Sequence, residues 1–321
     1  MDLIHVVLGL VILLFAGDIL VRGAVNLSLR LGIPALIVSL TVVAIGTSAP
    51  EMLVGIDAVR KGVPGLAVGN VVGSNISNIL LVLGVPALIF GLGTANSKPF
   101  REFGQMVVAT LLFIVFAMMN PITWVHGLIS MAVFLLILGQ SVYTARRERS
   151  AAQAAPSEAI DIEGADPHTP WWKIVGFLII GLIGLPIGAN LLVSGATNIA
   201  RDFHVSETVI GLTLVAVGTS LPELATTITA AFRRETDVAL GNVLGSNIAN
   251  LLAIIGISSF FGEIPVSKGV LYVDMWVMAA SVVLLAPFIF FKLNLSRIWG
   301  GAFTGLYVIY VFFVLFRGGG A

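Results

Sequence analysis

The chain has 321 residues, of which 58% are hydrophobic and only 11% carry a charge. A soluble domain of this size has about 25% charged residues, so the composition excludes an ordinary water-soluble fold and requires lipid to cover much of the surface. The net charge is zero and cysteine is absent, which gives no basic field for nucleic acid and excludes disulfides and thiolate metal sites.

Long apolar segments follow one another along the whole chain. A membrane-spanning helix needs roughly 20 mostly apolar residues, and ten segments satisfy this: 3–29, 34–59, 66–91, 103–119, 123–144, 171–200, 207–232, 238–261, 270–291 and 299–316. The first begins without Lys or Arg ahead of it, so we expect a retained helix rather than a cleaved signal peptide. The predicted fold is an all-α polytopic membrane protein with ten transmembrane helices.

The segment 145–170 differs in composition from the rest of the chain. It combines charged residues with Ser, Ala and Pro, which is typical of a solvated linker. This linker divides the chain into a first repeat of five helices at 1–144 and a second repeat of five helices at 171–321. We expect it to be a plain tether between the two.

The distribution of basic residues predicts the orientation in the membrane. With the N-terminus outside, 12 of the 17 Lys and Arg residues fall in cytoplasmic loops, which is what the positive-inside rule requires. We therefore expect a multi-pass protein of the cell (inner) membrane. Both termini lie outside in this prediction, and the linker 145–170 is cytoplasmic.

Two motifs occur once in each half of the chain. Gly-Thr-Ser-x-Pro-Glu stands at 46–51 and again at 218–223, and Gly-Asn-Val-x-Gly-Ser-Asn-Ile-x-Asn stands at 69–78 and again at 241–250. Both second copies lie 172 residues after the first, with no gap between the motifs. Because five is an odd number of helices, the second half must enter from the opposite side, which predicts an inverted-topology repeat. Such repeats place ion sites near the midplane, at broken helices.

A proline interrupts an apolar span in each first motif. Pro50 and Pro222 remove the hydrogen bond to the carbonyl four residues back, on Gly46 and Gly218. Loose backbone at membrane depth persists only where it is buried in protein or lines a cavity. The freed carbonyl oxygens are suitable ligands for Na⁺ or Ca²⁺. A simple proline kink is the alternative interpretation.

A glutamate follows each break. An acidic residue at the bilayer centre costs about 2.5–3.5 kcal/mol on insertion scales, and the motifs contain no Lys or Arg to pair with Glu51 or Glu223. Cations or protons are the remaining partners, and a buried protonated carboxyl at a helix end is the alternative. The hydroxyl residues before the glutamates are expected on the same side of the helix: Thr47, Ser48, Thr219 and Ser220.

The second motif adds neutral oxygens. Ser and Asn stand four residues apart on one helix face in each copy: Ser74 with Asn78, and Ser246 with Asn250. A Gly-x-x-x-Gly pair in each copy allows close approach of another helix. The alternative role for Ser74 and Ser246 is a hydrogen bond to a backbone carbonyl. Packing or capping is the expected role of the other motif asparagines: Asn70, Asn75, Asn242 and Asn247. Six to eight oxygens at about 2.3–2.6 Å suit Ca²⁺.

The four motif segments, within 41–78 and 213–250, resemble the alpha repeats of the sodium/calcium exchangers in the cation/calcium antiporter superfamily. The resemblance covers nearly the whole chain, which is similar to a compact prokaryotic member. It implies that the first and sixth helices pack outside an eight-helix core. It also implies that two glutamates coordinate Ca²⁺ and that further residues line the Ca²⁺ and Na⁺ sites: Glu51, Glu223, Thr47, Ser48, Thr219, Ser220, Ser74, Asn78, Ser246, Asn250 and, through their carbonyls, Ala44 and Ala216.

One position departs from the family pattern. Some exchangers, including archaeal ones, have an aspartate where this chain has Asn250. With Asn78 also an amide, the formal charge of the site is −2 when both glutamates are ionised. One Ca²⁺ or two Na⁺ neutralise this charge, whereas three Na⁺ leave +1, which a low-dielectric site penalises. The coupling ratio of the family therefore does not transfer directly to this chain.

Together these features predict a secondary active antiporter that exchanges Na⁺ for Ca²⁺ by alternating access and normally extrudes Ca²⁺. We expect no cofactor, and we expect the monomer to be the functional unit. The alternative is H⁺/Ca²⁺ (or other divalent cation) exchange with the same two glutamates. An ion channel is disfavoured because channels more often use rings of identical subunits. An intramembrane enzyme is disfavoured because no nucleophile, zinc-ligand set or phosphate loop accompanies the carboxylates.

Overall fold

The structure is a computed structural model that describes residues 2–94, 97, 99–152, 169–203 and 216–318. Within these ranges the chain is nearly all helical, and its β contacts are limited to two isolated bridges. The predicted all-α class is therefore confirmed.

The helices of the first half are α1 (Asp2–Leu31), α2 (Ala35–Val38), the π-helix η1 (Ser39–Val43), α3 (Ala44–Thr47), α4 (Ala49–Arg60), α5 (Pro64–Ser77), the π-helix η2 (Asn78–Val82), α6 (Gly84–Phe90), α7 (Phe100–Met119) and α8 (Trp124–Ala152). The second half contains α9 (Trp171–Asp202), α11 (Ala216–Thr219), α12 (Leu221–Phe232), α13 (Thr236–Ile248), the π-helix η5 (Ala249–Ile254), α14 (Ile255–Ser258), the π-helix η6 (Val270–Asp274), α15 (Met275–Phe290) and α16 (Arg297–Gly318).

Eight helical segments in the described part of the chain are long and apolar enough to cross a membrane. A bent pair, Ala35–Thr47 with Ala49–Arg60, provides a ninth candidate, and the angle between its two parts is 44°. The predicted span 207–232 begins outside the described residues, so the number of ten spans stays a prediction. α8 continues past residue 144, where the linker was expected to begin, and 153–168 lies outside the described residues.

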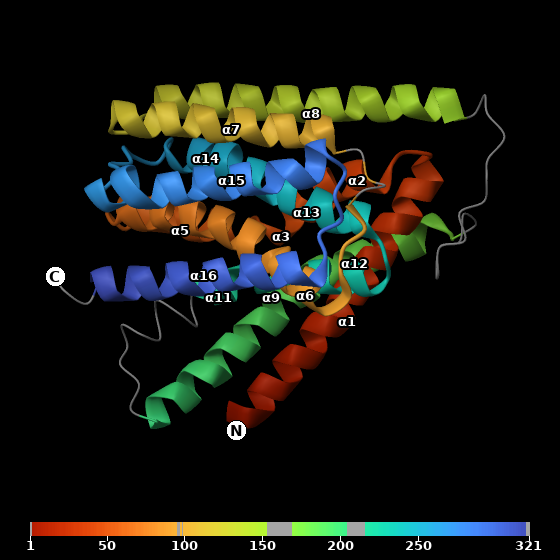
Figure 1. Ribbon diagram of the computed structural model, residues 1–321, viewed down its shortest axis with the longest axis horizontal. Coiled ribbons are helices and arrows are strands. Elements are labelled where there is room, and N and C mark those ends of the chain that lie inside the picture. The colour runs from red at the N-terminus through yellow and green to blue at the C-terminus, as the bar shows by residue number, and fades with distance from the viewer. Residues whose placement is uncertain (1, 95–96, 98, 153–168, 204–215, 319–321) are drawn as a thin grey trace.

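α1 and α9 form a long antiparallel pair that is tilted away from the remaining helices (Figure 1). Near the N-terminus of α1, Gly9 lies against Gly188 and Leu192 of α9, and near its middle Leu20 lies against Gly181. The residue numbers fall along one helix as they rise along the other, so the two helices run in opposite directions. This is the arrangement that an inverted repeat requires of its first helices.

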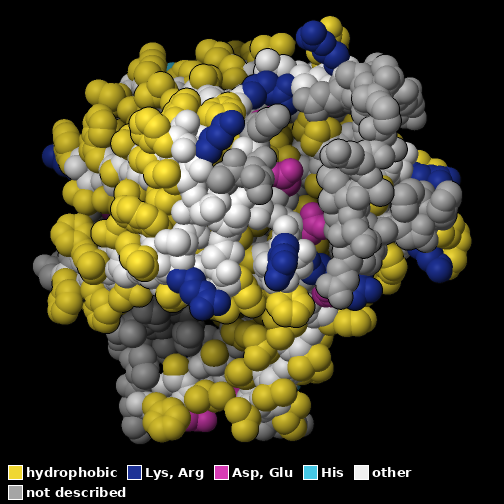
Figure 2. Space-filling model, turned by 45° about the vertical axis from the view of Figure 1, so that its right-hand side comes forward, with side chains coloured by type: hydrophobic (Ala, Val, Ile, Leu, Met, Phe, Trp, Pro, Cys, Tyr) yellow, Lys and Arg dark blue, Asp and Glu magenta, His cyan; other side chains and the backbone are white. Residues whose placement is uncertain are grey.

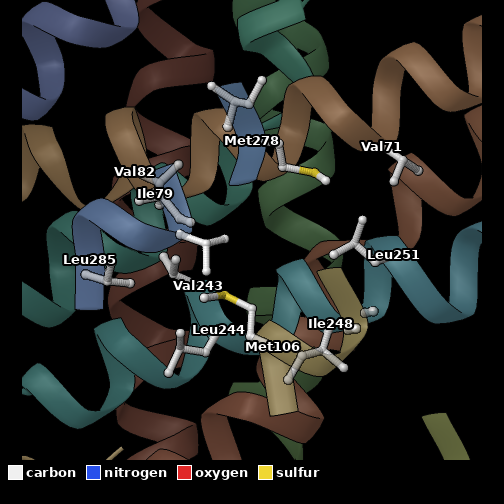
Figure 3. Close-up of a cluster of buried hydrophobic side chains, with 14 of the residues drawn as sticks. Val71, Ile79, Val82, Met106, Val243, Leu244, Ile248, Leu251, Met278 and Leu285 are labelled. Carbon is white, nitrogen blue, oxygen red and sulfur yellow. The ribbon is translucent and has the colours of Figure 1, made fainter. Parts of the chain in front are cut away.

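A buried apolar cluster surrounds α13 and η5 in the middle of the molecule (Figure 3). The cluster includes Met106 of α7 and Met278 of α15 together with Val243 and Ile248 of α13. Lipid tails are as apolar as these side chains, so close packing rather than exclusion of water holds the helices together. α13 is thus the central helix, and the surrounding helices pack against it.

Both β-bridges join the first half of the chain to the second. Leu92 pairs with Leu295, and Ile122 pairs with Ile264. Ile264 stands 172 residues after Leu92, and Leu295 follows the residue that stands 172 after Ile122. Each bridge therefore connects the sequence counterparts of the residues in the other bridge to within one residue. The π-helices η2 and η5 correspond in the same way.

An ion pair ties α1 to the end of α12. Arg233, which follows α12, donates from Nε to Asp18 Oδ1 of α1 at 2.6 Å. Arg22 pairs with the other carboxylate oxygen of Asp18 at 2.9 Å. The counterpart of Asp18 in the second half is Asn190, which carries no charge. The two halves therefore differ in how their first helix is attached to the core.

The contact between α1 and α9 generates a packing prediction. A Cβ on Gly9 would lie 2.5 Å from the Leu192 backbone nitrogen and 2.7 Å from the Gly188 carbonyl oxygen. Gly9→Val should therefore force the helices apart and cost about 1–3 kcal/mol of stability. Thermal unfolding in detergent measures this cost. Gly139→Val on α8 is the matched control, because no described atom beyond its chain neighbours and its own helix backbone lies within 4 Å of the added Cβ. Equal melting temperatures for the two variants would contradict the packing.

Candidate cation-binding site

Each copy of the first motif forms a break between two helices. α3 ends at Thr47 and α4 begins at Ala49, and Ser48 between them has φ −83° and ψ 5°. α11 and α12 meet in the same way at Ser220, which has φ −86° and ψ 2°. The prolines of both motifs lie in the first turn of the second helix, where a missing N–H is tolerated. The backbone therefore repeats one local conformation in both halves of the chain.

Glu51 and Glu223 lie in the first turns of α4 and α12 and are only 2% and 1% exposed. The positive end of the helix dipole favours a carboxylate in this position, yet a buried charge also needs a partner. Within the described residues neither glutamate forms an ion pair. The ion pairs found there involve other acids: Asp18, Asp57 and Glu102.

The two breaks lie next to each other in space. Ser48 Oγ donates a hydrogen bond to Glu223 Oε1 at 3.2 Å, which joins the first motif of one half to the glutamate of the other. Glu51 and Glu223 are close enough for their ionised forms to repel each other. Two neighbouring buried carboxylates are stable together only when a cation binds them or when one takes up a proton.

Asn242 of α13 connects the two halves a second time. Thr47 Oγ1 lies 3.3 Å from both Asn242 Oδ1 and the Ala44 carbonyl oxygen. Asn242 Nδ2 donates to the backbone oxygen of Glu223 at 3.4 Å and to Thr227 Oγ1 at 3.2 Å. The sequence assigns Asn242 a packing or capping role, whereas its side chain contacts two predicted site residues. One sequence signal could have indicated a role in the site, because Asn242 belongs to the repeated motif at 241–250.

The second motifs reach the same region through α5 with η2 and through α13 with η5. Asn78 is the first residue of η2 and Asn250 is the second residue of η5. π-helical turns are frequent at functional sites, and both motifs end in one. Asn78 Nδ2 donates to Asn247 Oδ1 at 3.0 Å, which links the two copies directly.

Gly241 lets α13 pack directly on the broken helix of the first half. A Cβ at Gly241 would lie 2.5 Å from the Leu36 carbonyl oxygen and 2.9 Å from Ser39 Cβ. Ser39 Oγ also donates to the Val238 carbonyl at 2.6 Å. The close approach predicted from the glycine pair is therefore confirmed in this copy. At Gly69, its counterpart, no described residue lies within 4 Å of an added Cβ.

Six of the twelve buried side-chain atoms that lack a hydrogen-bond partner, within the described chain, belong to predicted site residues. They are Glu51 Oε2, Asn78 Oδ1, Ser220 Oγ, Glu223 Oε2, Ser246 Oγ and Asn250 Oδ1. A buried polar atom without a partner costs roughly 1–3 kcal/mol, so six in matched motifs indicate a shared ligand. All six are oxygens, the atoms that hard cations bind. The residues therefore fit Ca²⁺ or Na⁺.

The remaining predicted site residues lie in the same elements. Ser74 is buried on α5, and Thr219 is half-buried at the end of α11. Ala216 is the first residue of α11, and only its backbone is described. The carbonyl of Ala44 faces the Thr47 hydroxyl. No contact tests the predicted carbonyl role of Ala216.

Comparison with known proteins decides the family. Residues 2–143 and 173–316 match the family model described as sodium/calcium exchanger protein. The chain belongs to the sodium/calcium exchanger family. Its fold and its paired motifs thus agree with one family over nearly the full length.

Individual proteins resemble the chain over most of its length. Sodium/calcium exchanger MaX1 of Methanosarcina acetivorans is 32% identical in an alignment that covers 96% of this chain and 97% of the relative. Inner membrane protein YrbG of Escherichia coli is 36% identical over 263 residues, 80% of each chain. A solved structure of the sodium-calcium exchanger NCX_Mj, soaked with zero Na⁺ and Ca²⁺, matches with a TM-score of 0.80 at 32% identity over 98% of both chains.

Membership makes this exchanger a multi-pass membrane transporter for cations including Ca²⁺ rather than an enzyme. The candidate site combines two carboxylates with neutral oxygens. Among the residues that the structure describes, no cluster of three His, Cys, Asp or Glu side chains could hold a metal ion. Fewer charges bind an ion less tightly. A low charge count suits an ion that must leave as well as enter.

The site generates a binding prediction. Ca²⁺ at 100 times its dissociation constant should stabilise the folded exchanger by about 2.7 kcal/mol and raise its melting temperature. Glu51→Gln and Glu223→Gln should each abolish that rise, because each removes one of the two charges. Asp57→Asn is the matched control: this acid also lies on α4, but its side chain is 57% exposed and pairs with Lys61. A Ca²⁺ effect that survives both glutamine substitutions would contradict the site.

Proposed function

We propose that this exchanger couples inward movement of Na⁺ to extrusion of Ca²⁺ by alternating access, with Glu51 and Glu223 as the shared ligands. The observation that carries the proposal is the pair of buried carboxylates from the two halves. It is accompanied by oxygens of the repeated motifs that have no hydrogen-bond partner among the described residues. Burial of this pair argues for a carrier over a channel, since an open pore would expose its charged side chains to water.

Competition for one pair of carboxylates explains the coupling. Glu51 and Glu223 repel each other when both are ionised, so the pair favours whichever cation neutralises it. One Ca²⁺ or two Na⁺ supply the required charge, and the amides Asn78 and Asn250 add none. Binding of Na⁺ therefore weakens the hold on Ca²⁺, and each ion leaves as the other arrives.

Alternating access follows from the inverted repeat that we propose for 1–144 and 171–321. The antiparallel pairing of α1 with α9 and the matched bridges between the halves support this division. In such proteins one helix group moves as a body against the other around a fixed site. α1 and α9 are the mobile group here, because they are tilted away from the packed core (Figure 1).

The proposed orientation has both termini outside and 145–170 in the cytoplasm. The C-terminal ends of α8 and α16 lie at opposite ends of the bundle (Figure 1), in agreement with this topology. Lys and Arg side chains are spread over the end of the molecule nearest the end of α8 (Figure 2), as the positive-inside rule requires of a cytoplasmic face. The name of the relative YrbG supports placement in the inner membrane.

Vesicle flux tests the proposed coupling. Purified protein in vesicles loaded with Na⁺ should take up Ca²⁺ only while an outward Na⁺ gradient exists, and uptake should stop when Na⁺ is equal on both sides. Glu51→Gln and Glu223→Gln should reduce uptake to the level of empty vesicles, with Asp57→Asn as the active control. Uptake that ignores Na⁺ but follows a pH gradient would overturn Na⁺ coupling in favour of proton exchange at the same glutamates.

A further inference from the structure

Asn242 holds parts of both halves of the site with one side chain. It is fully buried on α13. Its carbonyl oxygen lies 3.3 Å from the hydroxyl of Thr47, in the first half. Its amide nitrogen donates to the Glu223 backbone oxygen and to Thr227 Oγ1, both on α12 of the second half. The polarity of the amide matches its neighbours, because each end faces a group of the opposite kind.

These contacts fix the direction of two cation ligands. The hydroxyl of Thr47 can donate to Asn242 or to the Ala44 carbonyl, and in either case its lone pairs are left for another partner. The bond to the Glu223 backbone holds the first turn of α12, which carries the Glu223 carboxylate. Ligands held in place before binding lose less entropy when the ion arrives.

The matching half of the molecule differs at the amide nitrogen of the corresponding asparagine. Asn70 is the counterpart of Asn242 and is half-buried, and its Nδ2 has no hydrogen-bond partner among the described residues. The counterpart of Thr227 is Gly55, which has no hydroxyl to accept a bond. A Cβ on Gly55 would lie 2.9 Å from Ile254 Cγ2, so packing with η5 occupies that position instead. The two halves therefore differ because one has Thr227 where the other has Gly55.

We propose that Asn242 is a positioning residue for ion exchange. Its side-chain oxygen holds the hydroxyl of Thr47. Its side-chain nitrogen, which bonds to the Glu223 backbone and to Thr227, holds the first turn of α12 in the ion-binding arrangement. The ligands of the site occur as matched pairs from the two halves. Asn242 makes the half that contains Glu223 the more rigid of the two. The inference rests on the proposed function, because it assigns a role within the same site. It predicts unequal effects for substitutions at two asparagines that occupy equivalent places in the repeat.

Equilibrium binding of Ca²⁺ tests this directly on the purified full-length protein, by isothermal titration without Na⁺. Asn242→Ala should raise the dissociation constant about tenfold, which corresponds to about 1.4 kcal/mol. Asn70→Ala, the matched control, should change it less than about twofold. Thr227→Val should weaken binding in the same direction, and Thr227→Ser, which keeps the hydroxyl, should restore it. The Thr227 pair tests the proposal even if Asn242→Ala fails to fold.

A double substitution separates positioning from general loss of structure. If Asn242 acts through Thr47, then Asn242→Ala combined with Thr47→Val should bind Ca²⁺ no more weakly than the weaker single variant. In vesicles the half-saturating Ca²⁺ concentration should rise while the maximal rate of exchange is retained. Equal effects of Asn242→Ala and Asn70→Ala, or fully additive effects with Thr47→Val, would overturn the proposal. Wild-type protein that binds Ca²⁺ without exchanging it would instead refute the proposed function, and the titrations would still decide the role of Asn242.

Discussion

The repulsion between two buried carboxylates is the constraint on which the rest of this exchanger depends. Glu51 and Glu223 are almost fully enclosed by protein and lie close together, so neither can keep its charge cheaply without a cation or a proton. The helix breaks, the π-helical turns and the packing of α13 bring further oxygens to this pair. Two buried carboxylates that need positive charge for neutralisation are suited to bind one cation and release it for another.

The halves match in their ligands and differ in what holds those ligands. Asn242 bonds to Thr227, whereas the counterparts are Asn70 and Gly55. Asp18 ties α1 to Arg233, whereas its counterpart Asn190 carries no charge. Lys61, the counterpart of Arg233, instead pairs with Asp57 of α4, the helix that it follows. Two conformations related by exchange of the halves would therefore differ in energy. In the proposed alternating-access cycle, an energy difference of this kind would bias the side of the membrane that the site faces at rest.

Repetition made much of this molecule predictable from its sequence. The offset of 172 residues located Glu51, Glu223 and the broken helices, because a proline and a charge together inside an apolar span are costly and persist mainly at functional sites. The role of Asn242 was not predictable, since it depends on how α13 lies against α12, and periodicity says nothing about that register. The π-helical turns and the extension of α8 to Ala152 were also missed, because local composition does not encode them. The predicted span 207–232 is described only from Ala216.

The most direct test of the central claim is the effect of Na⁺ on equilibrium binding of radioactive Ca²⁺ to the purified exchanger. If Na⁺ and Ca²⁺ share Glu51 and Glu223, Na⁺ should raise the apparent dissociation constant for Ca²⁺ steeply while the number of Ca²⁺ bound at saturation stays the same. A fall in that number at unchanged affinity, or indifference to Na⁺, would mean that the two ions do not compete for one pair of carboxylates.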